Sequence, residues 1–178
     1  MDTLYALVLA GGRGTRFWPL SREDTPKQCV PIGDNEAHLA QTISRLLPVI
    51  PAERILIVTG RPMEDAVRSI VPDVPSENIL VEPWARNNAP SIGWGAVEIG
   101  KRCADGVMAI FPCDHQIDDA QAFQNVVRSA SIAAKATNAI ITLAIKPTRP
   151  ETGFGYLEIG PVTGEWGKHQ FRAVENFI

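Results

Sequence analysis

The sequence predicts an α/β fold, built as a mostly parallel sheet with helices on both faces and a partial antiparallel addition. Short apolar runs alternate with longer segments of helical spacing over residues 4–145. Such a strand–helix–strand series requires right-handed crossovers, which make the strands parallel and place helices on the faces of the sheet. Beyond Pro150 the pattern changes to period-two alternation, which is typical of antiparallel strands. The length of 178 residues fits one domain, which we assign to residues 1–178.

Five apolar runs are the predicted strands of the parallel sheet. They cover residues 4–10, 54–59, 78–81, 107–111 and 139–145. Gly11, Gly60 and Pro112, which are residue types that interrupt strands, follow the first, second and fourth runs directly. Nearly continuous apolar runs suit strands that are buried on both faces, as in a parallel sheet covered by helices.

Four segments between these runs are the predicted helices, over residues 37–47, 62–71, 89–103 and 119–136. The third contains Gly93, Gly95 and Gly100, from which we expect close packing of this helix against the sheet. Residues 152–160 and 169–178 form the predicted antiparallel addition. Because the chain stops inside the second of these strands, we expect it to be the N-terminal portion of a longer protein.

Charge and cysteine content exclude several classes of partner. The net charge of −3 leaves no overall basic field that would attract nucleic acid or an anionic membrane surface. No apolar stretch approaches the roughly 20 residues that a membrane-spanning helix needs. Cys29, Cys103 and Cys113 are odd in number and lack C-x-x-C spacing, which argues against a disulfide framework or a zinc site. We therefore expect a cytoplasmic protein with neither a nucleic-acid nor a membrane partner.

A glycine-rich segment directly after the first predicted strand is the main candidate for ligand binding. Gly11, Gly12 and Gly14 leave the backbone N–H groups of the turn open to a ligand. Four cations follow close by in the sequence, at positions 13, 16, 22 and 27. A glycine turn edged with cations is suited to a polyphosphate. The spacing matches neither the P-loop nor the Rossmann fingerprint, so on the glycines alone a tight strand exit with solvated arginines is an equal alternative.

Other polar segments also follow predicted strand ends, namely residues 82–88, Asp114 and residues 146–149. Ligands of parallel α/β sheets bind beyond the carboxyl ends of the strands, so we expect these segments to converge with the glycine loop on one cleft. Asp114 comes just past a buried strand, where an unpaired carboxylate is costly. Coordination of Mg²⁺ with phosphate oxygens and water would relieve that cost, whereas a helix-capping or turn aspartate is the alternative.

Four segments carry a resemblance to one enzyme family. The first is L-A-G-G-R-G-T-R-F-W-P-L-S-R at residues 9–22, followed by P-K-Q. The second, F-P-C-D-H-Q-I, resembles F-x-P-S-D-H-x-I with Cys113 at the usual serine position. The third, E-P-W-A-R-N-N-A-P, has Asn88 where the family has threonine, and the fourth, at 145–156, has Phe154 where the family has tyrosine. Together they resemble sugar-nucleotide pyrophosphorylases, and among these the mannose-1-phosphate guanylyltransferases, which implies a Rossmann-like nucleotidyltransferase fold.

The resemblance implies transfer of GMP from GTP to mannose 1-phosphate, with Mg²⁺ as the cofactor and GDP-mannose and pyrophosphate as the products. The reaction is an in-line attack on the α-phosphate of GTP, in which positioning and charge neutralisation lower the barrier. The catalytic roles fall to Arg16 at the β- and γ-phosphates, Lys27 at the α-phosphate and Asp114 as the metal ligand. The residues expected to bind the triphosphate are Leu9, Ala10, Gly11, Gly12, Gly14 and Thr15.

Base and sugar sites are assigned on the same resemblance. Guanine presents two adjacent donors, N1–H and the 2-amino group, which one carboxylate can accept as a bidentate pair, so we expect Glu82 to select guanine. Arg86, Asn87 and Asn88 would surround the base and ribose, and a loop salt bridge from Glu82 to Arg86 is the alternative. The sugar-binding residues are expected to be Gly155, Tyr156 and Glu158.

Two further interpretations are open at this level. One is a related enzyme that uses UTP, dTTP or CTP with another sugar phosphate, and the other is a nucleotide-binding regulatory module without catalysis. Because the family's F-x-E-K-P segment would come after Ile178, we expect the 178-residue chain alone to bind GTP weakly and to turn over poorly. A homodimer is an open expectation.

Overall fold

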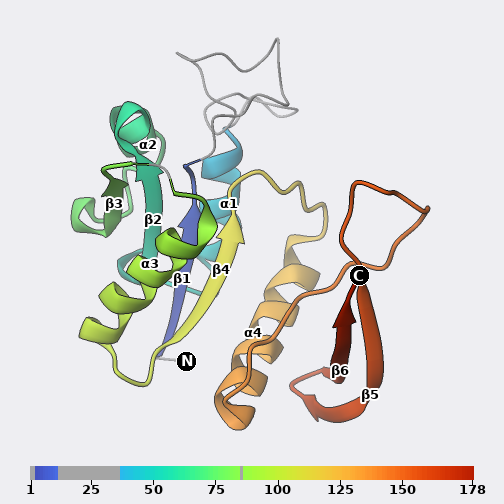
Figure 1. The fold of residues 1–178 in the computed structure, drawn as a ribbon. Helices are drawn as coiled ribbons and strands as arrows, with labels where there is room; N and C mark the ends of the chain where they lie inside the picture. The colour runs from blue at the N-terminus through green and yellow to red at the C-terminus, as the bar shows by residue number, and fades with distance from the viewer. Residues whose placement is uncertain (1–2, 12–36, 85) are drawn as a thin grey trace. The chain divides into compact units, whose positions relative to one another are not determined.

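The computed structural model describes residues 3–11, 37–84 and 86–178. Contacts within the chain divide it into two compact units, Met1–Ala120 and Gln121–Ile178. In the described part of the first unit, a parallel sheet has the strand order β3-β2-β1-β4 (Figure 1). Its strands are β1 (Leu4–Leu9), β2 (Ile55–Gly60), β3 (Ile79–Glu82) and β4 (Val107–Pro112). The first four predicted strands are thereby confirmed.

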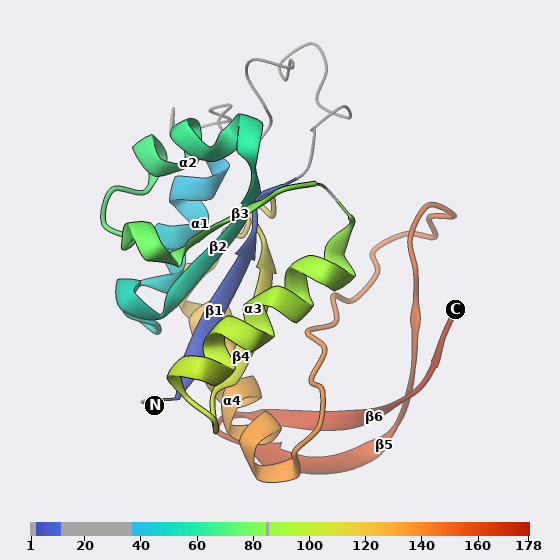
Figure 2. The ribbon, with the colours of Figure 1, turned by 60° about the vertical axis from the view of Figure 1, so that its left-hand side comes forward.

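Helices cover both faces of this sheet, as predicted (Figures 1 and 2). One face carries α1 (His38–Leu46) and α2 (Glu64–Ile70), and the other carries α3 (Asn88–Arg102). Short 3-10 turns lie between these elements: η3 (Ala52–Arg54), η4 (Arg61–Met63) and η5 (Ser76–Asn78). The arrangement follows from right-handed crossovers, because the chain steps in one direction from β1 to β3 and then returns to β4 on the other side of β1.

Both faces of the sheet are apolar because both are covered. On the α3 face one buried cluster is formed by Tyr5, Leu7, Leu56, Val58, Leu80 and Ile99. The intervening strand residues Ala6, Val8, Ile55 and Ile57 are fully buried as well. Successive side chains of a strand point to opposite faces, so a strand that packs on both sides needs apolar residues at every position. This is the physical reason for the continuous runs seen in the sequence.

Close approach of α3 to the sheet depends on one of its three glycines. A Cβ on Gly95 would lie 2.5 Å from Cδ2 of Leu7, so no larger residue fits without a shift. Gly93 and Gly100 have no described atom within 4 Å of the corresponding position. At 100° per residue these two positions face away from the Gly95 side of the helix. The prediction is therefore correct for Gly95 and wrong for Gly93 and Gly100.

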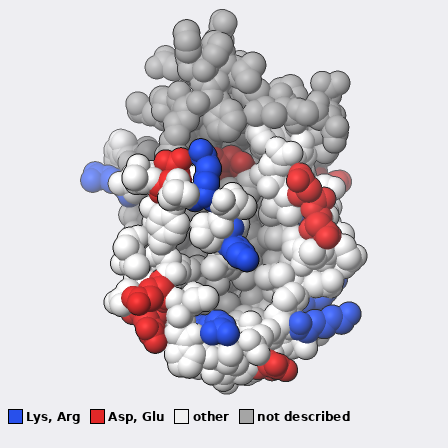
Figure 3. Space-filling model, turned by 90° about the vertical axis from the view of Figure 1, so that its right-hand side faces the viewer, with Lys and Arg blue, Asp and Glu red and all other residues white. Residues whose placement is uncertain are grey.

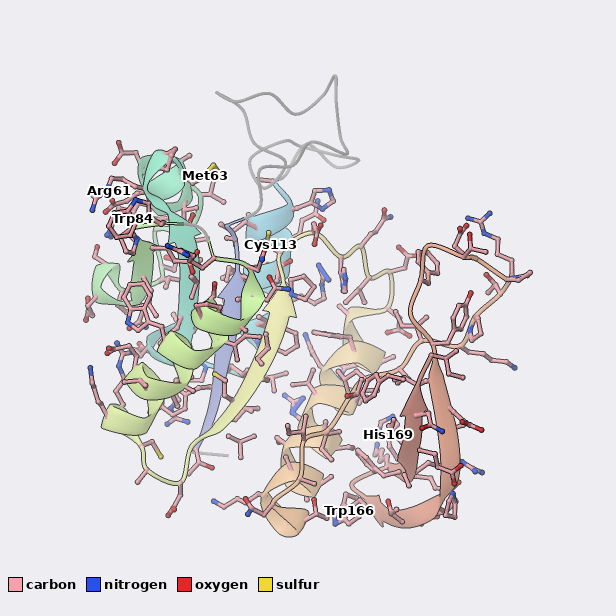
Figure 4. The ribbon with its side chains drawn as sticks, in the orientation of Figure 1. Arg61, Met63, Trp84, Cys113, Trp166 and His169 are labelled. Carbon is pink, nitrogen blue, oxygen red and sulfur yellow. The ribbon has the colours of Figure 1, made fainter. Side chains whose placement is uncertain are left out.

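The second unit contains most of helix α4 (Ala120–Thr137) and a hairpin of β5 (Leu157–Trp166) and β6 (His169–Phe177). The two strands pair antiparallel, which confirms the predicted addition. Gly167 in the connecting turn has a φ of +62°, a conformation that glycine adopts readily. The Ser129 hydroxyl of α4 lies 2.9 Å from Nδ1 of His169 and ties the helix to the turn end of the hairpin. Figure 4 labels His169 on the hairpin.

The fifth predicted strand is wrong. Residues 139–145 form no strand within the described part of the chain. Ile140 and Ile145 are 97% and 86% exposed, so the apolar run is not packed as a buried strand would be. An apolar run favours extended backbone, but a strand exists only where another strand supplies its hydrogen bonds. That partner is a property of tertiary structure and cannot be read from the run itself.

Two surface properties of the described residues bear on possible partners. Among the described helices, none combines the length and apolar character that a membrane crossing requires. Among the described residues on the face drawn in Figure 3, basic side chains are scattered among acidic ones.

Candidate functional site

All strands of the parallel sheet end at one edge, where the candidate site lies. Leu9 of β1 is in register with Val58 of β2 and Pro112 of β4, and Gly60 of β2 is in register with Glu82 of β3. The residues that follow each strand therefore leave the sheet side by side. This edge is where ligands of open parallel sheets bind.

The exit of β1 is held by hydrogen bonds to β2. The backbone N–H of Ala10 donates to the carbonyl of Val58 at 2.8 Å, and the Thr59 hydroxyl donates to the carbonyl of Ala10 at 3.2 Å. Both Ala10 and Thr59 are fully buried. Leu9, Ala10 and Gly11 are thus the anchored start of the predicted phosphate loop. The other predicted residues of this loop and its cations lie outside the described residues: Gly12, Gly14, Thr15, Arg16 and Lys27.

Glu82 is a buried carboxylate at this edge, with 9% of its surface exposed. Its Oε1 accepts a hydrogen bond from the Ser91 hydroxyl at 2.6 Å. Its Oε2 lies 3.5 Å from the position that a Cβ on Gly11 would take. Since β2 separates β1 from β3, the side chain reaches across the end of β2 at Gly60, where no side chain obstructs it. The structure therefore brings Gly11 and Glu82 together, as expected.

The loop between β3 and α3 carries the other predicted base-binding residues. Arg86, Asn87 and Asn88 are exposed, and among the described ion pairs none joins Glu82 to Arg86. The salt-bridge alternative is thus not what holds Glu82. Asn87 has φ 64° and ψ −168°, a combination that is strained for any residue with a Cβ. Backbone strain of this kind is typical of functional sites and makes the turn a candidate for ligand contact.

Asp114 is half-buried just past the end of β4. The backbone on both sides of it is anchored. The N–H of Cys113 donates to the carbonyl of Leu9 at 3.4 Å, and the Thr42 hydroxyl donates to the carbonyl of Cys113 at 3.3 Å. Nη1 and Nη2 of Arg45 donate to the carbonyl of His115 at 3.2 and 3.4 Å. Helix α1 thereby fixes the backbone that carries Asp114.

Arg45 is an unusual residue in this support, because its side chain is largely removed from water. Burial lowers the pKa of its guanidinium from the ordinary value. Its guanidinium faces a backbone carbonyl, which is a neutral acceptor. Thr42 and Arg45 were not singled out from the sequence, and nothing in a polar residue on an amphipathic helix indicates which distant carbonyl it will bind.

Asp114 is the described residue that the sequence analysis predicts as a metal ligand. No group of three or more histidine, cysteine, aspartate or glutamate residues in the described part of the chain could hold a metal ion. A single carboxylate at the ligand edge still fits Mg²⁺, which keeps several waters and is commonly held by one or two carboxylates together with substrate phosphates. It does not fit a metal that needs an all-protein cage.

The predicted sugar residues lie in the second unit, at the start of β5. The Tyr156 hydroxyl accepts from the N–H of Glu151 at 2.8 Å and donates to the carbonyl of Glu151 at 3.0 Å. Glu158 accepts from Nδ2 of Asn176 at 2.7 Å across the hairpin. Gly155 precedes Tyr156, whose backbone pairs with Ile178. An open hollow of about 490 Å³ is lined by residues 147–152 and Tyr156, within the size range of ligand sites.

A parallel sheet that carries Gly11 and the buried Glu82 carboxylate at its ligand edge places the chain among the open α/β proteins that bind ligands beyond the carboxyl ends of their strands. The sequence profile of the nucleotidyl transferases matches residues 5–178, and the chain belongs to that family. It is 37% identical over 179 residues to the xanthan biosynthesis protein XanB of Xanthomonas campestris pv. campestris. It is 34% identical over 183 residues to the mannose-1-phosphate guanylyltransferase of Escherichia coli. These alignments cover 100% and 98% of the chain and 37% and 38% of the two relatives.

Solved structures support the same assignment. A crystal structure from Thermus thermophilus, described as a mannose-1-phosphate geranyltransferase, superposes with a TM-score of 0.87 at 34% identity. The superposition covers 99% of this chain and 50% of that one. A mannose-6-phosphate isomerase from Helicobacter pylori superposes with a TM-score of 0.71 at 20% identity, which shows the shared fold alone. The Rossmann-like nucleotidyltransferase fold predicted from the sequence is confirmed.

Proposed function

We propose that this chain forms the nucleotide-binding part of an enzyme that transfers GMP from GTP to mannose 1-phosphate, with GDP-mannose and pyrophosphate as products. The observation that carries the proposal is the Glu82 carboxylate, buried and held beside Gly11 at the ligand edge of the sheet. Family membership and the Escherichia coli relative named mannose-1-phosphate guanylyltransferase support it. The chain spans less than two fifths of that relative, so the reaction is proposed for the protein as a whole.

In the proposed reaction a phosphate oxygen of mannose 1-phosphate attacks the α-phosphorus of GTP in line with the leaving group. The new bond joins that oxygen to the α-phosphorus, and the bond from the α-phosphorus to the oxygen that bridges to the β-phosphate breaks. Pyrophosphate leaves with the electron pair. The attacking oxygen is already ionised, so no general base is needed and His115 has no proton-transfer role.

The phosphate loop binds the triphosphate in this proposal. Gly11 would offer its backbone N–H at the anchored exit of β1, and Gly12, Gly14 and Thr15 would continue the cradle. The Arg16 guanidinium would neutralise charge on the β- and γ-phosphates, where it grows as pyrophosphate departs. The Lys27 ammonium would act in the same way at the α-phosphate.

Base selection falls to Glu82, since guanine offers two adjacent donors to one carboxylate. Adenine, uracil, thymine and cytosine do not present that pair. Arg86, Asn87 and Asn88 would lie around the base and ribose, at the exposed start of α3. A related enzyme with another nucleotide would need a different acceptor pattern at this position.

Asp114 would hold Mg²⁺, for which its backbone is fixed by α1 and by Leu9. When bound, Mg²⁺ would neutralise negative charge on the phosphate oxygens. The role of Asp114 is to orient its oxygens toward the triphosphate.

In the second unit, Gly155, Tyr156 and Glu158 would bind the sugar, with the Glu158 carboxylate accepting a hydrogen bond from a hydroxyl. Free thiols at Cys103 and Cys113 are in keeping with the cytoplasm as the place of action.

A comparison of GTP with ITP tests the proposal, because ITP keeps N1–H and lacks the 2-amino group. The wild type should bind GTP at least about tenfold more tightly than ITP in the presence of Mg²⁺, measured by titration calorimetry. Glu82→Gln places an amide against the purine and should remove most of that preference. Glu77→Gln, an exposed glutamate just before β3, is the matched control and should leave the preference unchanged. Equal discrimination by wild type and Glu82→Gln would refute the assignment.

A further inference from the structure

Ser91 is a buried polar residue that sequence reasoning did not single out. It lies in the first turn of α3 with 6% of its surface exposed. Its hydroxyl stands 2.6 Å from Oε1 of Glu82 and 3.0 Å from the carbonyl of Asn87. It therefore contacts two of the residues proposed to bind the nucleoside.

The contact with Glu82 is the stronger of the two. A serine hydroxyl carries one proton, so the two acceptors share it. The shorter contact goes to an ionisable carboxylate, and hydrogen bonds to charged acceptors are about twice as strong as those between neutral groups. The longer contact is a back bond from residue 91 to residue 87, of the kind that serines in helices often make.

The contact also sets the orientation of the carboxylate. With Oε1 held against α3, Oε2 is the oxygen that lies beside Gly11 at the exit of β1. An ionised carboxylate has about four acceptor positions, so one bond from Ser91 leaves room for a bidentate contact with a purine edge. Without the hydroxyl, the glutamate side chain is free to rotate and must lose that freedom on binding.

We propose that Ser91 is a positioning residue for base selection, which orients the Glu82 carboxylate toward a purine nucleotide that carries a 2-amino group. The inference rests on the proposed function of Glu82. Ser91 touches neither the base nor the phosphates in this proposal and acts through Glu82. Its effect should therefore appear in the preference between two purines more than in fold stability.

The test uses Ser91→Ala and Ser91→Thr in the same protein. Ser91→Ala should reduce the ratio of GTP to ITP affinity by about fivefold, the size of the net contribution of one typical hydrogen bond. Ser91→Thr retains the hydroxyl and should restore the ratio to near the wild-type value. Affinities for both nucleotides are measured by titration calorimetry with Mg²⁺, and thermal unfolding of each variant is recorded alongside.

Ser69→Ala is the matched control, because the Ser69 hydroxyl makes the same kind of back bond, to the carbonyl of Asp65 at 3.0 Å, without meeting a carboxylate. It should leave the GTP to ITP ratio unchanged. If Ser91→Ala unfolds at the wild-type temperature and keeps the wild-type ratio, the positioning role is refuted while the proposed function stands. If Ser91→Thr behaves like Ser91→Ala although it is folded, the hydroxyl is not the cause and the inference fails. If the wild type itself shows no preference for GTP, the role of Glu82 fails and this inference falls with it.

Discussion

The proposed nucleotide site and the proposed sugar residues are held in different ways. At the carboxyl edge of the sheet, hydrogen bonds join residues far apart in the sequence, such as Thr42 to Cys113 over 71 positions and Thr59 to Ala10 over 49. In the second unit, the Tyr156 hydroxyl binds Glu151, five positions away. The proposed nucleotide site thus depends on the folded core of the first unit, whereas the proposed sugar residues depend on bonds within their own loop and hairpin. Substitutions in the two regions should therefore differ in how much they change stability and in how far through the molecule their effects extend.

The exposed fractions of apolar side chains also differ between the core strands and the hairpin. Leu7 in β1 is fully buried, whereas Ile159, Val162 and Val174 in the hairpin are 58%, 44% and 40% exposed. Apolar side chains stabilise a fold in proportion to the area they remove from water. The core strands therefore contribute more to stability than the hairpin strands do.

The largest effect is expected from Leu7→Ala. Loss of a fully buried leucine should lower the free energy of unfolding by about 3 kcal/mol, through lost burial and the cavity left behind. Ile159→Ala, at a half-exposed hairpin position, should cost less than about 1 kcal/mol. Urea unfolding of both variants measures the difference. A similar cost at the two positions would contradict the contrast between core and hairpin.

Gly95→Ala should have the next largest effect. The added methyl would meet Leu7 at 2.5 Å, so overpacking should destabilise the first unit by about 1–2 kcal/mol despite the better helix propensity of alanine. Gly93→Ala meets no described atom within 4 Å and should instead stabilise α3 by about 0.5–1 kcal/mol. If the packing is as described, thermal unfolding should show a loss of stability for Gly95→Ala and a gain for Gly93→Ala. Equal signs would show that α3 does not approach β1 this closely.

Asn87→Gly should have a smaller effect, in which stability increases while the affinity for GTP decreases. Glycine relieves the strain at φ 64° and should raise the free energy of unfolding by about 1 kcal/mol, while loss of the amide should weaken GTP binding. Asn138, the other described non-glycine residue with positive φ, follows α4 and serves as the control. Asn138→Gly should leave GTP affinity unchanged. Unaltered GTP binding by Asn87→Gly would remove Asn87 from the base site.

The smallest effect is expected from Tyr156→Phe. Loss of the hydroxyl removes both bonds to Glu151 and should cost about 0.5–1 kcal/mol, confined to the loop at residues 151–156. Hydrogen exchange at the Glu151 amide should accelerate while exchange in β1 stays the same. GTP affinity should also stay the same, because the affected loop belongs to the sugar residues. A loss of GTP binding would show that the two regions are not independent.

Much of the fold could be predicted from local pattern. Apolar runs, helical spacing and glycine or proline at the ends located the first four strands, the helices and the hairpin. The strand prediction for residues 139–145 was wrong because an apolar run does not show whether a neighbouring strand will supply hydrogen bonds. The glycines of α3 were predicted as a group, yet the direction of each around the helix axis determines which one meets the sheet.

The candidate site, too, was predicted in part from local pattern and in part depends on tertiary structure. The sequence by itself determined that a glycine-rich segment follows the first strand and that carboxylates come at the ends of the third and fourth. It also determined that these motifs resemble one family, because each motif is a short run of residue types. Tertiary structure alone decided that Glu82 reaches Gly11 across β2 and that Ser91 and Arg45 support the site. The physical reason is that such contacts depend on the strand order β3-β2-β1-β4, which brings together side chains and carbonyls that no local pattern connects.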